Sequence, residues 1–447
     1  MSTFTTFPAI THEPMRSNEM SNPVRETGLD DVVHAELRGW LRADGRKGIR
    51  NTLVVAYLVE CGHHVANEIG RPFEGESVHV IGFPGCFPNT YAQNVMDRIC
   101  THPNVGAVLL ISLGCESFNK RRLRDAVEAS GRPVHTITIQ ERGGTRAAIA
   151  EGREWVRTHG VALNEMPTVA MSVSELVIGT ICGGSDGTSG ITGNPAAGRA
   201  FDRLIAEGAA CIFEETGELI GCEEIMAARA VTAELGERLV ETVDKAARYY
   251  ETMGHGSFAP GNADGGLSTI EEKSLGAYAK SGRSSISGIL KPGISPPAGG
   301  LYLLDVVPDG EVRFGFPNIN DNAEIVELIS CGCHTVIFVT GRGSVVGSAI
   351  APVIKVCANP DTFLRMQEDM DVNAGRILNG EATLDDVGQE IYELVLGLGN
   401  GRRSVSEQLG HQEFVLTYKH FDSLGPSCLP GVSVVHASMP DVHVAKR

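Results

Sequence analysis

The sequence predicts an α/β protein: a Rossmann-like N-terminal domain built on a parallel sheet, followed by a larger α/β domain. Short apolar runs rich in β-branched residues recur from Thr52 onward, and such runs are typical of parallel strands buried on both faces. Stretches with helical periodicity lie between several of them. Glycine accounts for 53 of the 447 residues, and it gathers at the ends of the runs, where open α/β sheets bind their ligands.

The first domain is expected over residues 36–165, after a polar tail of residues 1–35 that lacks periodicity. Its strands are expected at Thr52–Val59, Val78–Phe83, Ala107–Leu113 and Val134–Ile139. Its helices are expected to include Thr90–Ile99 and Lys120–Ala129. We interpret Thr158–Pro167 as the boundary to the second domain.

The second domain is expected over residues 166–447 and should contain the catalytic site, because most of the polar glycine-rich segments lie there. Its strands are expected at Glu175–Cys182, Ala210–Glu215, Gly300–Val307, Thr335–Gly341 and Pro352–Asn359. A long helix is expected at Ala228–Tyr250, and the Pro/Gly-rich segment Gly293–Gly300 predicts a turn.

Charge and composition narrow the functional class. Thirty-eight basic against 55 acidic residues give a net charge of −17, which does not suit a nucleic-acid binder because phosphate contacts need a basic face. No apolar run approaches the ~18 residues of a membrane span, and the first twenty residues contain no signal-peptide core. Eleven cysteines are too sparse for a disulfide scaffold. We therefore expect a cytoplasmic enzyme with a small-molecule substrate.

The segment Gly39–Asn51 is basic and contains several glycines. Arginine forks match carboxylates in two-pronged contacts, so this segment is a candidate carboxylate clamp. The alternative is a solvated basic loop without a ligand. Its charged residues include Arg42, Asp44, Arg46 and Arg50.

The segment Gly183–Gly198 directly follows an apolar run that ends at Cys182. It combines glycines with hydroxyl, amide and carboxylate side chains, a mixture that suits a polyhydroxylated or phosphorylated ligand. The alternative is a helix N-terminus with its caps. The polar side chains include Ser185, Asp186, Ser189, Thr192 and Asn194.

Three further segments place charged side chains near predicted strand ends. The alternative to a functional site is a solvated helix for the first two segments. For the third segment, the alternative is a plain turn between a strand and a helix. The third lacks the spacing of a nucleotide-binding phosphate loop, so we exclude nucleotide hydrolysis. The residues of interest are Glu215, Glu218 and Glu223 in the first segment, Lys273, Ser274 and Lys280 in the second, and Arg342 and Lys355 in the third.

Cys86, Cys115 and Cys182 each stand in a glycine context at the end of a predicted strand. Three thiolates could hold an iron–sulfur cluster and leave one iron open as a Lewis acid. The alternative is that each is an ordinary buried cysteine. We interpret the Cys331–His334 motif as structural, because it precedes a predicted strand instead of ending one.

Together, these segments resemble the altronate/galactarate dehydratase (altronate hydrolase) family, which also includes the large subunit of sulfolactate sulfo-lyase. The resemblance spans about residues 36–414, and the CGGSD and EKSLG segments make it specific. It implies a carbon–oxygen lyase (hydro-lyase) that removes water, or sulfite, from a 2,3-substituted acid to give a 2-keto product, and it implies iron dependence. The chain carries, in the family's order, GWLRADGRKGIRN, SLGCES, CGGSDGTSGITGNPAAG, EETGELIGCEE, PGNADGGLSTIEEKSLG, TGRGS and MDVNAG.

Combined with this resemblance, the segments yield three groups of candidate residues. The catalytic candidates are Lys273, Glu215, Glu218, Glu223 and Asp186. The substrate-binding candidates are Arg42, Asp44, Arg46, Arg50, Asn51, Ser185, Ser189, Thr192, Asn194, Ser274, Arg342 and Lys355. The metal-binding candidates are Cys86, Cys115 and Cys182, for iron as Fe²⁺ or as a cluster.

Two departures from the family pattern affect the prediction. Family dehydratases begin with a small domain of the SAF type, where this chain has only about 35 residues, so we expect a small SAF-domain subunit as a partner. Association into a homo-oligomer is a separate expectation. Many members also carry a histidine shortly before the cysteine that Cys86 matches, where this chain has Gly82-Phe83-Pro84. We predict a dehydratase that converts a sugar acid, such as altronate or a galactarate-like acid, to a 2-keto-3-deoxy acid. The alternatives are a sulfolactate sulfo-lyase large subunit and a non-catalytic sugar-acid-binding paralogue.

Overall fold

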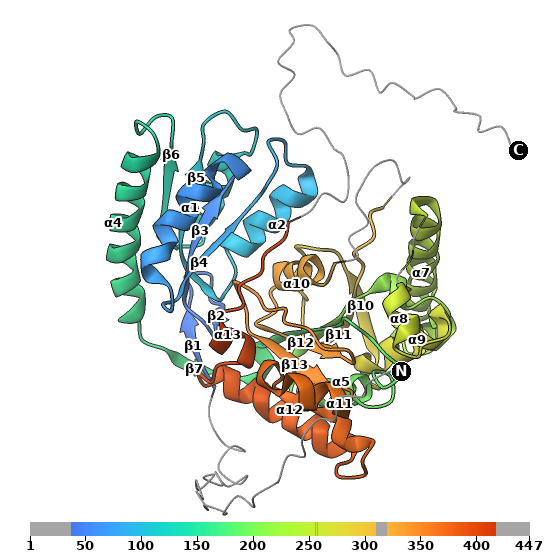
Figure 1. Ribbon diagram of the computed structural model, residues 1–447. Coiled ribbons are helices and arrows are strands. Elements are labelled where there is room, and N and C mark those ends of the chain that lie inside the picture. Colours follow the sequence, from blue (N-terminus) through green and yellow to red (C-terminus); the bar gives the residue numbers. More distant parts are fainter. Residues whose placement is uncertain (1–36, 255, 257, 310–319, 417–447) are drawn as a thin grey trace, which may run out of the picture. The chain divides into compact units, whose positions relative to one another are not determined.

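The computed structural model describes residues 37–254, 256, 258–309 and 320–416 (Figure 1). The predicted tail, residues 1–35, lies outside the described residues. The described chain forms one four-stranded and one seven-stranded sheet, both with parallel pairing, and a small antiparallel sheet. This arrangement confirms the predicted α/β class. No helix among the described residues has the length and apolar character needed to cross a membrane.

The four-stranded sheet has the order β4-β3-β5-β6. The central strands β3 and β5 are apolar along nearly their whole length, a pattern typical of strands buried on both faces. The sequence pattern predicted all four strands within a few residues. The strands are β3 (Thr52–Tyr57), β4 (Val78–Gly82), β5 (Val105–Ser112) and β6 (Val134–Thr138).

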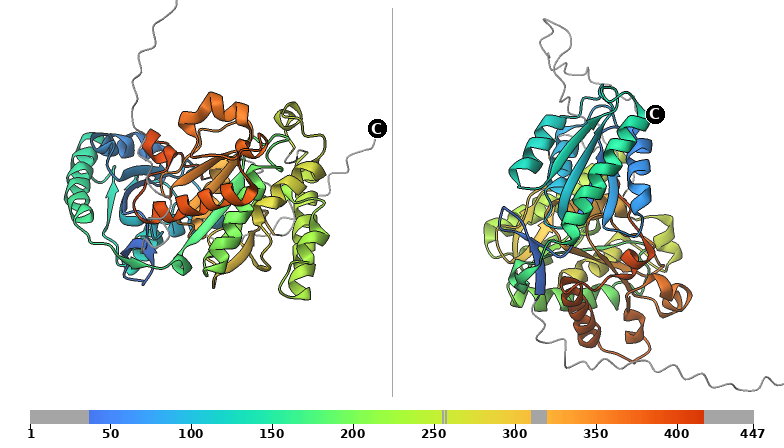
Figure 2. Two further views of the ribbon diagram at one scale, coloured as in Figure 1. Left: turned by 90° about the horizontal axis from the view of Figure 1, so that it is seen from below. Right: turned by 90° about the vertical axis from the view of Figure 1, so that its left-hand side faces the viewer.

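Helices cover both faces of this sheet (Figure 2). Alternate residues of β3 point to opposite faces, so Leu53 packs with α1 and α4, while Val54 packs with α2 and α3. The helices are α1 (His63–Gly70), α2 (Thr90–Cys100), α3 (Lys120–Ala129) and α4 (Thr145–Asn164).

Helix α4 ends inside the segment that the sequence suggested as a boundary. It continues to Asn164 and therefore includes most of Thr158–Pro167. Val156 and Leu163 lie seven residues apart on one helix face, and both are buried against the sheet. This packing stabilises the helix although the sequence between them is polar.

The seven-stranded sheet has the order β10-β11-β9-β8-β12-β13-β14, with β8 at its centre. All five strands predicted for this sheet are present, and the sequence pattern missed its two edge strands, β10 and β14. The strands are β8 (Val177–Cys182), β9 (Ala210–Phe213), β10 (Ile286–Leu290), β11 (Gly300–Leu304), β12 (Thr335–Thr340), β13 (Val353–Cys357) and β14 (Val372–Asn373).

Helices α5 (Gly193–Ala206) and α12 (Leu384–Gly399) cover one face of this sheet, and α10 (Asp321–Ser330) covers the other (Figure 1). The apolar side chains of α10 belong to the same cluster as those of α2 and α3, so one core joins the two parallel sheets.

The predicted helix Ala228–Tyr250 is helix α7 (Ala233–Met253). It begins later than predicted because the Thr232 side chain caps it, accepting a hydrogen bond of 3.2 Å from the Leu235 amide. The other helices are α6 (Glu223–Ala227), α8 (Pro260–Asp264), α9 (Ile270–Tyr278), α11 (Pro360–Met366) and α13 (Val405–Leu409).

The antiparallel sheet has the order β2-β1-β7, and its strands are β1 (Leu37–Leu41), β2 (Lys47–Gly48) and β7 (Val169–Met171). The remaining elements are short 3₁₀ helices. They are Glu60–Gly62, Arg71–Phe73, Val173–Glu175, η5 (Thr216–Glu218), η6 (Ala279–Ser281), Gln367–Asp369 and Ala374–Ile377.

Buried hydrogen bonds also tie the two parallel sheets together. The Asn104 side chain donates to the carbonyl oxygens of His334 (3.1 Å) and Ile350 (3.2 Å). The His334 ring accepts a hydrogen bond from the Val177 amide (3.0 Å), and its other nitrogen lies 2.8 Å from the Lys47 carbonyl oxygen. Both ring nitrogens therefore bind main chain, in agreement with the structural role predicted for the Cys331–His334 motif.

Candidate active site and metal centre

The carboxyl ends of β8 and β9 lie side by side in the middle of the seven-stranded sheet. Cys182 is the last residue of β8, Glu215 follows β9 by two residues, and Glu218 closes η5. Because neighbouring parallel strands end at the same edge, three residues from two separate segments meet there.

Glu215 adopts an unusual backbone conformation. Its φ of 84° is the only positive value at a non-glycine residue in the described part of the chain, and the left-handed region costs such a residue ~1–2 kcal/mol. Its carboxylate accepts a hydrogen bond of 3.1 Å from the Cys182 amide. Backbone strain of this kind clusters at functional sites.

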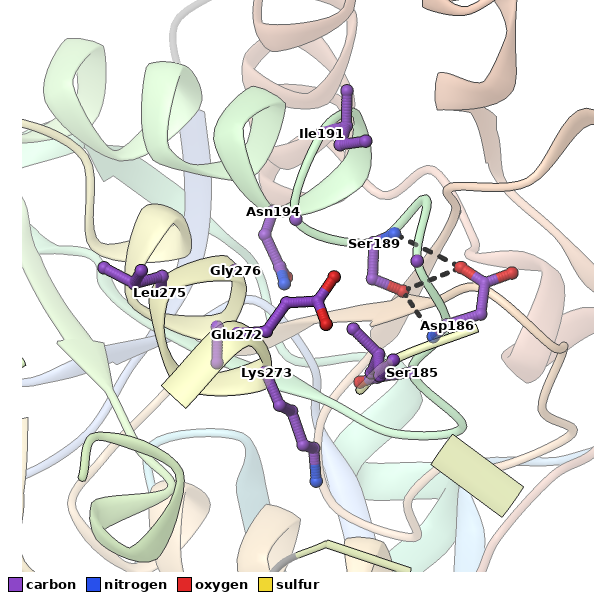
Figure 3. Close-up of a pocket in the computed structure, with 13 residues that line it drawn as sticks. Ser185, Asp186, Ser189, Ile191, Asn194, Glu272, Lys273, Leu275 and Gly276 are labelled. Carbon is purple, nitrogen blue, oxygen red and sulfur yellow. Dashed lines mark hydrogen bonds between the residues drawn. The ribbon is translucent and has the colours of Figure 1, made fainter. Parts of the chain in front are cut away.

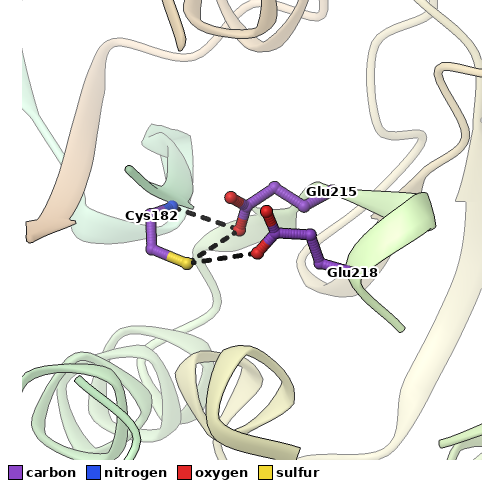
Figure 4. Close-up of side chains that lie close together, drawn as sticks. All are labelled: Cys182, Glu215 and Glu218. Atoms are coloured by element: carbon purple, nitrogen blue, oxygen red, sulfur yellow. Dashed lines mark hydrogen bonds between the residues drawn. The ribbon is translucent and has the colours of Figure 1, made fainter. Parts of the chain in front are cut away.

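Cys182, Glu215 and Glu218 form a buried group of ligating atoms (Figure 4). The Cys182 Sγ lies 3.3 Å from Glu215 Oε2 and 3.7 Å from Glu218 Oε2, and one ligand atom from each residue lies within 4.8 Å of the other two. A thiolate and two carboxylates at these distances could hold a divalent metal ion. Among the described residues, this is the one such group.

Two buried lysines flank this group. Lys273 of α9 pairs with Glu218, and Lys280 of η6 pairs with Glu215. The Lys280 Nζ also lies 3.2 Å from the Cys182 Sγ. Buried charges are stable only when they are paired in this way.

The pKa shifts follow from burial and from these pairs. Burial raises the pKa of the Cys182 thiol, while Lys280 acts in the opposite direction. Burial also raises the pKa of Glu218, although the charge of Lys273 opposes it. For Lys273, burial acts to lower the pKa, but the charge of Glu218 outweighs burial and leaves the pKa raised. Lys273 is therefore an ammonium at neutral pH.

A cavity of about 270 Å³ opens beside this group. Asp321 and Glu324 of α10 contribute carboxylates to its lining, and Arg342 contributes a guanidinium that donates to the Gly261 carbonyl oxygen at 2.5 Å. Burial, followed by the charge of Glu218, raises the pKa of Asp321 to about 6. A Cβ at Gly183 would overlap the Asp321 carboxylate, so Asp321 lies directly beside the turn after Cys182.

Asp321 and Glu324 were not among the sequence candidates. The only sequence signal was a pair of acidic residues three positions apart at the start of a helix, and such residues are common because they favour helix N-termini. Their position across the cavity from Cys182 depends on how α10 packs on the sheet.

Most polar residues of the loop after β8 hold the loop itself in shape, whereas Ser185 lies next to the Cys182 thiol. The Asp186 carboxylate accepts hydrogen bonds from the Thr188 amide (2.9 Å) and from the Asn359 side chain (2.9 Å), and Thr192 donates to the Ala358 carbonyl oxygen (2.8 Å). These contacts hold the loop in shape, and the catalytic role expected of Asp186 stays a prediction. Ser185 lies closer to the centre, and its Oγ is 3.4 Å from the Cys182 Sγ.

A second cavity, of about 230 Å³, lies next to the first, and Ser185 and Lys273 line both (Figure 3). Asn194 and Ser189 also line this second cavity, but Ser189 is tied to Asp186. Ser274 is fully buried in α9 and lines neither cavity.

The arginines of the predicted carboxylate clamp bind the chain's own acceptors instead. Arg42 donates to Asn51 Oδ1 (2.8 Å) and to the Pro103 carbonyl oxygen (2.7 Å). Arg46 pairs with Asp44 at 2.6 Å. None of these residues lines the cavity beside Cys182 within the described chain. This placement does not fit the predicted clamp, because these guanidinium groups lie outside the cavity lining and bind acceptors of the chain itself.

Arg50 gives a direct test of this correction. Its fork contacts Glu407 at 2.6 and 2.9 Å. Burial acts to raise the pKa of Glu407, but the hydrogen bonds and charge of Arg50 outweigh burial and lower it. Such a pair stabilises the fold above the unfolded-state pKa of about 4.3, and this contribution is lost as the pH falls through the lower folded-state pKa.

We therefore expect Arg50→Met to lower the free energy of unfolding by about 2–4 kcal/mol at pH 7 and by much less in acid, with kcat/KM unchanged. Urea unfolding at pH 7 and in acid, with kinetics at pH 7, measures both effects. If the variant folds but its kcat/KM is tenfold lower, Arg50 binds the substrate after all, and the predicted carboxylate clamp is supported.

Two other candidates also lie away from the Cys182–Glu215–Glu218 group. The Lys355 Nζ is 3.2 Å from the His411 ring, and Lys355 does not line the cavity beside Cys182. The Glu223 carboxylate accepts a hydrogen bond from the Gly221 amide (2.9 Å), a local contact just before α6.

Cys86 and Cys115, the other two predicted cysteine ligands, lie outside the Cys182–Glu215–Glu218 group. Cys86 and Cys115 are exposed and follow strands of the four-stranded sheet. The Ser117 amide donates to the Cys86 carbonyl oxygen at 2.9 Å, so these two loops are neighbours. Among the described residues, only Cys182 belongs to a group of metal-ligating atoms. Its companions are glutamates because β9, and not a cysteine-bearing loop, is the neighbour of β8.

Comparison with known proteins adds the family context. Residues 39–164 match the family described as the D-galactarate dehydratase/altronate hydrolase second domain. Residues 173–421 match the D-galactarate/altronate dehydratase C-terminal family. The second match includes Cys182, both glutamates and Lys273.

Curated relatives are similar over most of the chain. The (2R)-sulfolactate sulfo-lyase subunit beta of Chromohalobacter salexigens is 34% identical over 85% of this chain and 96% of its own length. The galactarate dehydratase (L-threo-forming) of Escherichia coli is 31% identical over 89% of this chain and 79% of its own length. The altronate dehydratase of Escherichia coli is 29% identical over 85% of this chain and 77% of its own length. These matches agree with the geometry of the site, and the chain belongs to the D-galactarate/altronate dehydratase family of lyases.

Proposed function

We propose that this protein is a hydro-lyase that removes water from a 2,3-dihydroxy sugar acid and releases a 2-keto-3-deoxy acid. The observation that carries the proposal is the buried Cys182–Glu215–Glu218 group, paired with two lysines and open to a cavity. The names of the relatives, which include altronate and galactarate dehydratases, support the substrate class.

Cys182, Glu215 and Glu218 would hold an iron ion as Fe²⁺. The mixed sulfur and oxygen donor set suits a borderline first-row metal better than a hard ion such as Mg²⁺. When bound, the metal supplies a Lewis acid for the departing hydroxyl. Because these three side chains are then ligands, the proton transfers fall to other groups in the cavity.

Asp321 is our candidate for the base. It is a carboxylate in the cavity lining outside the ligand group, and with a pKa of about 6 it is mostly ionised at neutral pH. The proton on C2 passes to Asp321, the electron pair of that C–H bond forms the C2–C3 double bond, and the C3–O bond breaks. Lys273, held as an ammonium by Glu218, donates the proton that turns the leaving hydroxyl into water. The enol then becomes the 2-keto acid by moving its hydroxyl proton to C3.

Arg342 is our candidate for the substrate carboxylate. It is the arginine that lines the cavity within the described chain. One of its N–H groups donates to the Gly261 carbonyl oxygen, and a guanidinium carries five donors, so others remain for a carboxylate. A cation at this point stabilises the negative charge that develops when C2 loses its proton.

A substrate panel tests the proposed function. The metal-loaded protein is assayed with six-carbon aldonates, six-carbon aldarates and sulfolactate, following 2-keto acid and sulfite separately. We expect 2-keto acid from a dihydroxy acid without sulfite. Turnover of sulfolactate alone would instead support a sulfo-lyase, the second candidate, which the 34% identity and 96% coverage of the sulfo-lyase subunit favour.

We also propose a small partner subunit of the SAF type. The support is the name of the relative, a subunit beta, which belongs to a protein of more than one subunit. The panel is therefore best run on protein purified from its native extract as well as on the isolated chain. A small protein that co-purifies and raises turnover would support the partner, whereas full activity of the isolated chain would contradict it.

A further inference from the structure

The second cavity extends the site away from the ligand group. It has a volume of about 230 Å³ and shares Ser185 and Lys273 with the cavity beside Cys182. Pockets that bury a small organic ligand typically measure ~300–1,000 Å³, so neither cavity reaches that size alone, whereas the two together do. A substrate that reacts beside Cys182 would pass Ser185 and Lys273, the residues that line both cavities, to reach the second cavity.

Asn194 is the polar group that lacks a partner in this second cavity. It is the second residue of α5, only 1% of its surface is exposed, and its Oδ1 has no hydrogen-bond partner among the described residues. In Figure 3 its side chain points into the cavity, toward Glu272 and Lys273. An unpaired buried amide oxygen is destabilising, and a ligand hydroxyl placed there would give it a hydrogen-bond partner.

The charges around this cavity disfavour a ligand that carries a second carboxylate at its distal end. Within the described lining, Lys273 is the only cation, and its ammonium is paired with Glu218. Glu272 contributes a carboxylate that is held at the lining by the Ser268 hydroxyl (2.6 Å) and amide (2.7 Å). A distal carboxylate on the ligand would face Glu272 without a free cation, whereas uncharged hydroxyls would not be repelled.

We propose that the second cavity binds the hydroxyl-bearing tail of a sugar acid with a single carboxylate, and that Asn194 hydrogen-bonds one tail hydroxyl. Asn194 thereby sets specificity for long aldonic acids over three-carbon acids and over aldaric acids. The inference rests on the proposed function, because it assumes that the reacting end of the acid lies beside Cys182.

The test compares substrates of different length in Asn194→Leu. Loss of one neutral hydrogen bond should lower kcat/KM for a six-carbon aldonate roughly tenfold, with less than about a twofold change for glycerate, the three-carbon acid that cannot reach Asn194. Asn373→Leu is the matched control, because Asn373 also has a buried, unpaired Oδ1 but lines neither cavity. The control should leave both substrates unchanged.

A second variant tests the charge argument without altering the buried core. Glu272 is exposed, so Glu272→Gln should fold, and it should raise kcat/KM for a six-carbon aldarate about two- to fivefold, the range of exposed charge interactions. The wild-type protein should prefer the aldonate. Equal losses for long and short acids in Asn194→Leu, or a wild-type preference for the aldarate, would overturn the inference.

Calorimetric binding of the aldonate separates this inference from the proposed function. If the wild-type protein binds the aldonate more tightly than Asn194→Leu does but dehydrates no acid, the proposed function fails and the tail site stands. If dehydration occurs and the Asn194→Leu effect does not depend on tail length, the proposed function stands and the tail site fails. If the wild-type protein binds no acid, both fail.

Discussion

Cys182→Ser is expected to remove metal binding and turnover together. Cys182 contributes the only sulfur to the ligand group, and a serine hydroxyl is a much weaker ligand than a thiolate. We expect affinity for Fe²⁺ to fall at least about a hundredfold, since even groups that only support ligands are worth ten- to a hundredfold. Metal per chain after anaerobic loading and the rate of 2-keto acid formation measure the two effects, and thermal unfolding shows whether the fold survives.

Cys86→Ser and Cys115→Ser are the matched controls for this experiment. Both residues are exposed and lie outside the Cys182–Glu215–Glu218 group, so each variant should keep its metal and its activity. The same two variants distinguish a cluster held by three cysteines from a metal ion held by Cys182, Glu215 and Glu218. If either control loses iron along with turnover, the three cysteines act together as cluster ligands, and the mixed thiolate–carboxylate centre is wrong.

Asp321→Asn is expected to slow the reaction ~10²–10⁴-fold in kcat while the metal stays bound. This range is the usual contribution of a positioned general base, and an amide cannot take the C2 proton. Asparagine has nearly the shape of aspartate, so the cavity and the start of α10 should be preserved. Steady-state kinetics with metal analysis on the same sample measure the separation between chemistry and metal binding.

Asp361→Asn provides the control for the helix position. Asp361 also lies in the first turn of a helix, α11, but it does not line the cavity beside Cys182. Asp361→Asn should therefore change the free energy of unfolding by a few tenths of a kcal/mol through the helix dipole, and it should leave kcat unchanged. If Asp321→Asn keeps near-normal turnover, the base is another group, and Lys273 and the ligand-group glutamates become the residues to test next.

The sequence determined the secondary structure of the sheets well. Runs such as Thr52–Tyr57 and Thr335–Thr340 are apolar without interruption, and only a strand buried on both faces needs that pattern. The glycine-rich loop after Cys182 was located for the same local reason, because it directly follows such a strand. The edge strands β10 and β14 were missed, and β14, at two residues, is too short to show a pattern.

The tertiary structure decided which side chains form the centre. The sequence proposed Cys86 and Cys115 as companions of Cys182, yet strand order places β9 beside β8 and so brings Glu215 and Glu218 to the thiol. A strand's neighbours depend on long-range packing and not on its own residues.

The tertiary structure also decided the roles of the charged residues. Arg50 looked free to bind a ligand, but its partner Glu407 lies 357 positions away in the sequence. Asp321 was not a sequence candidate, and it lies beside the turn after Cys182 because α10 packs against the sheet there. An ionisable side chain acquires its function from the charges, acceptors and burial around it, and in this fold those surroundings come from segments that are distant in sequence.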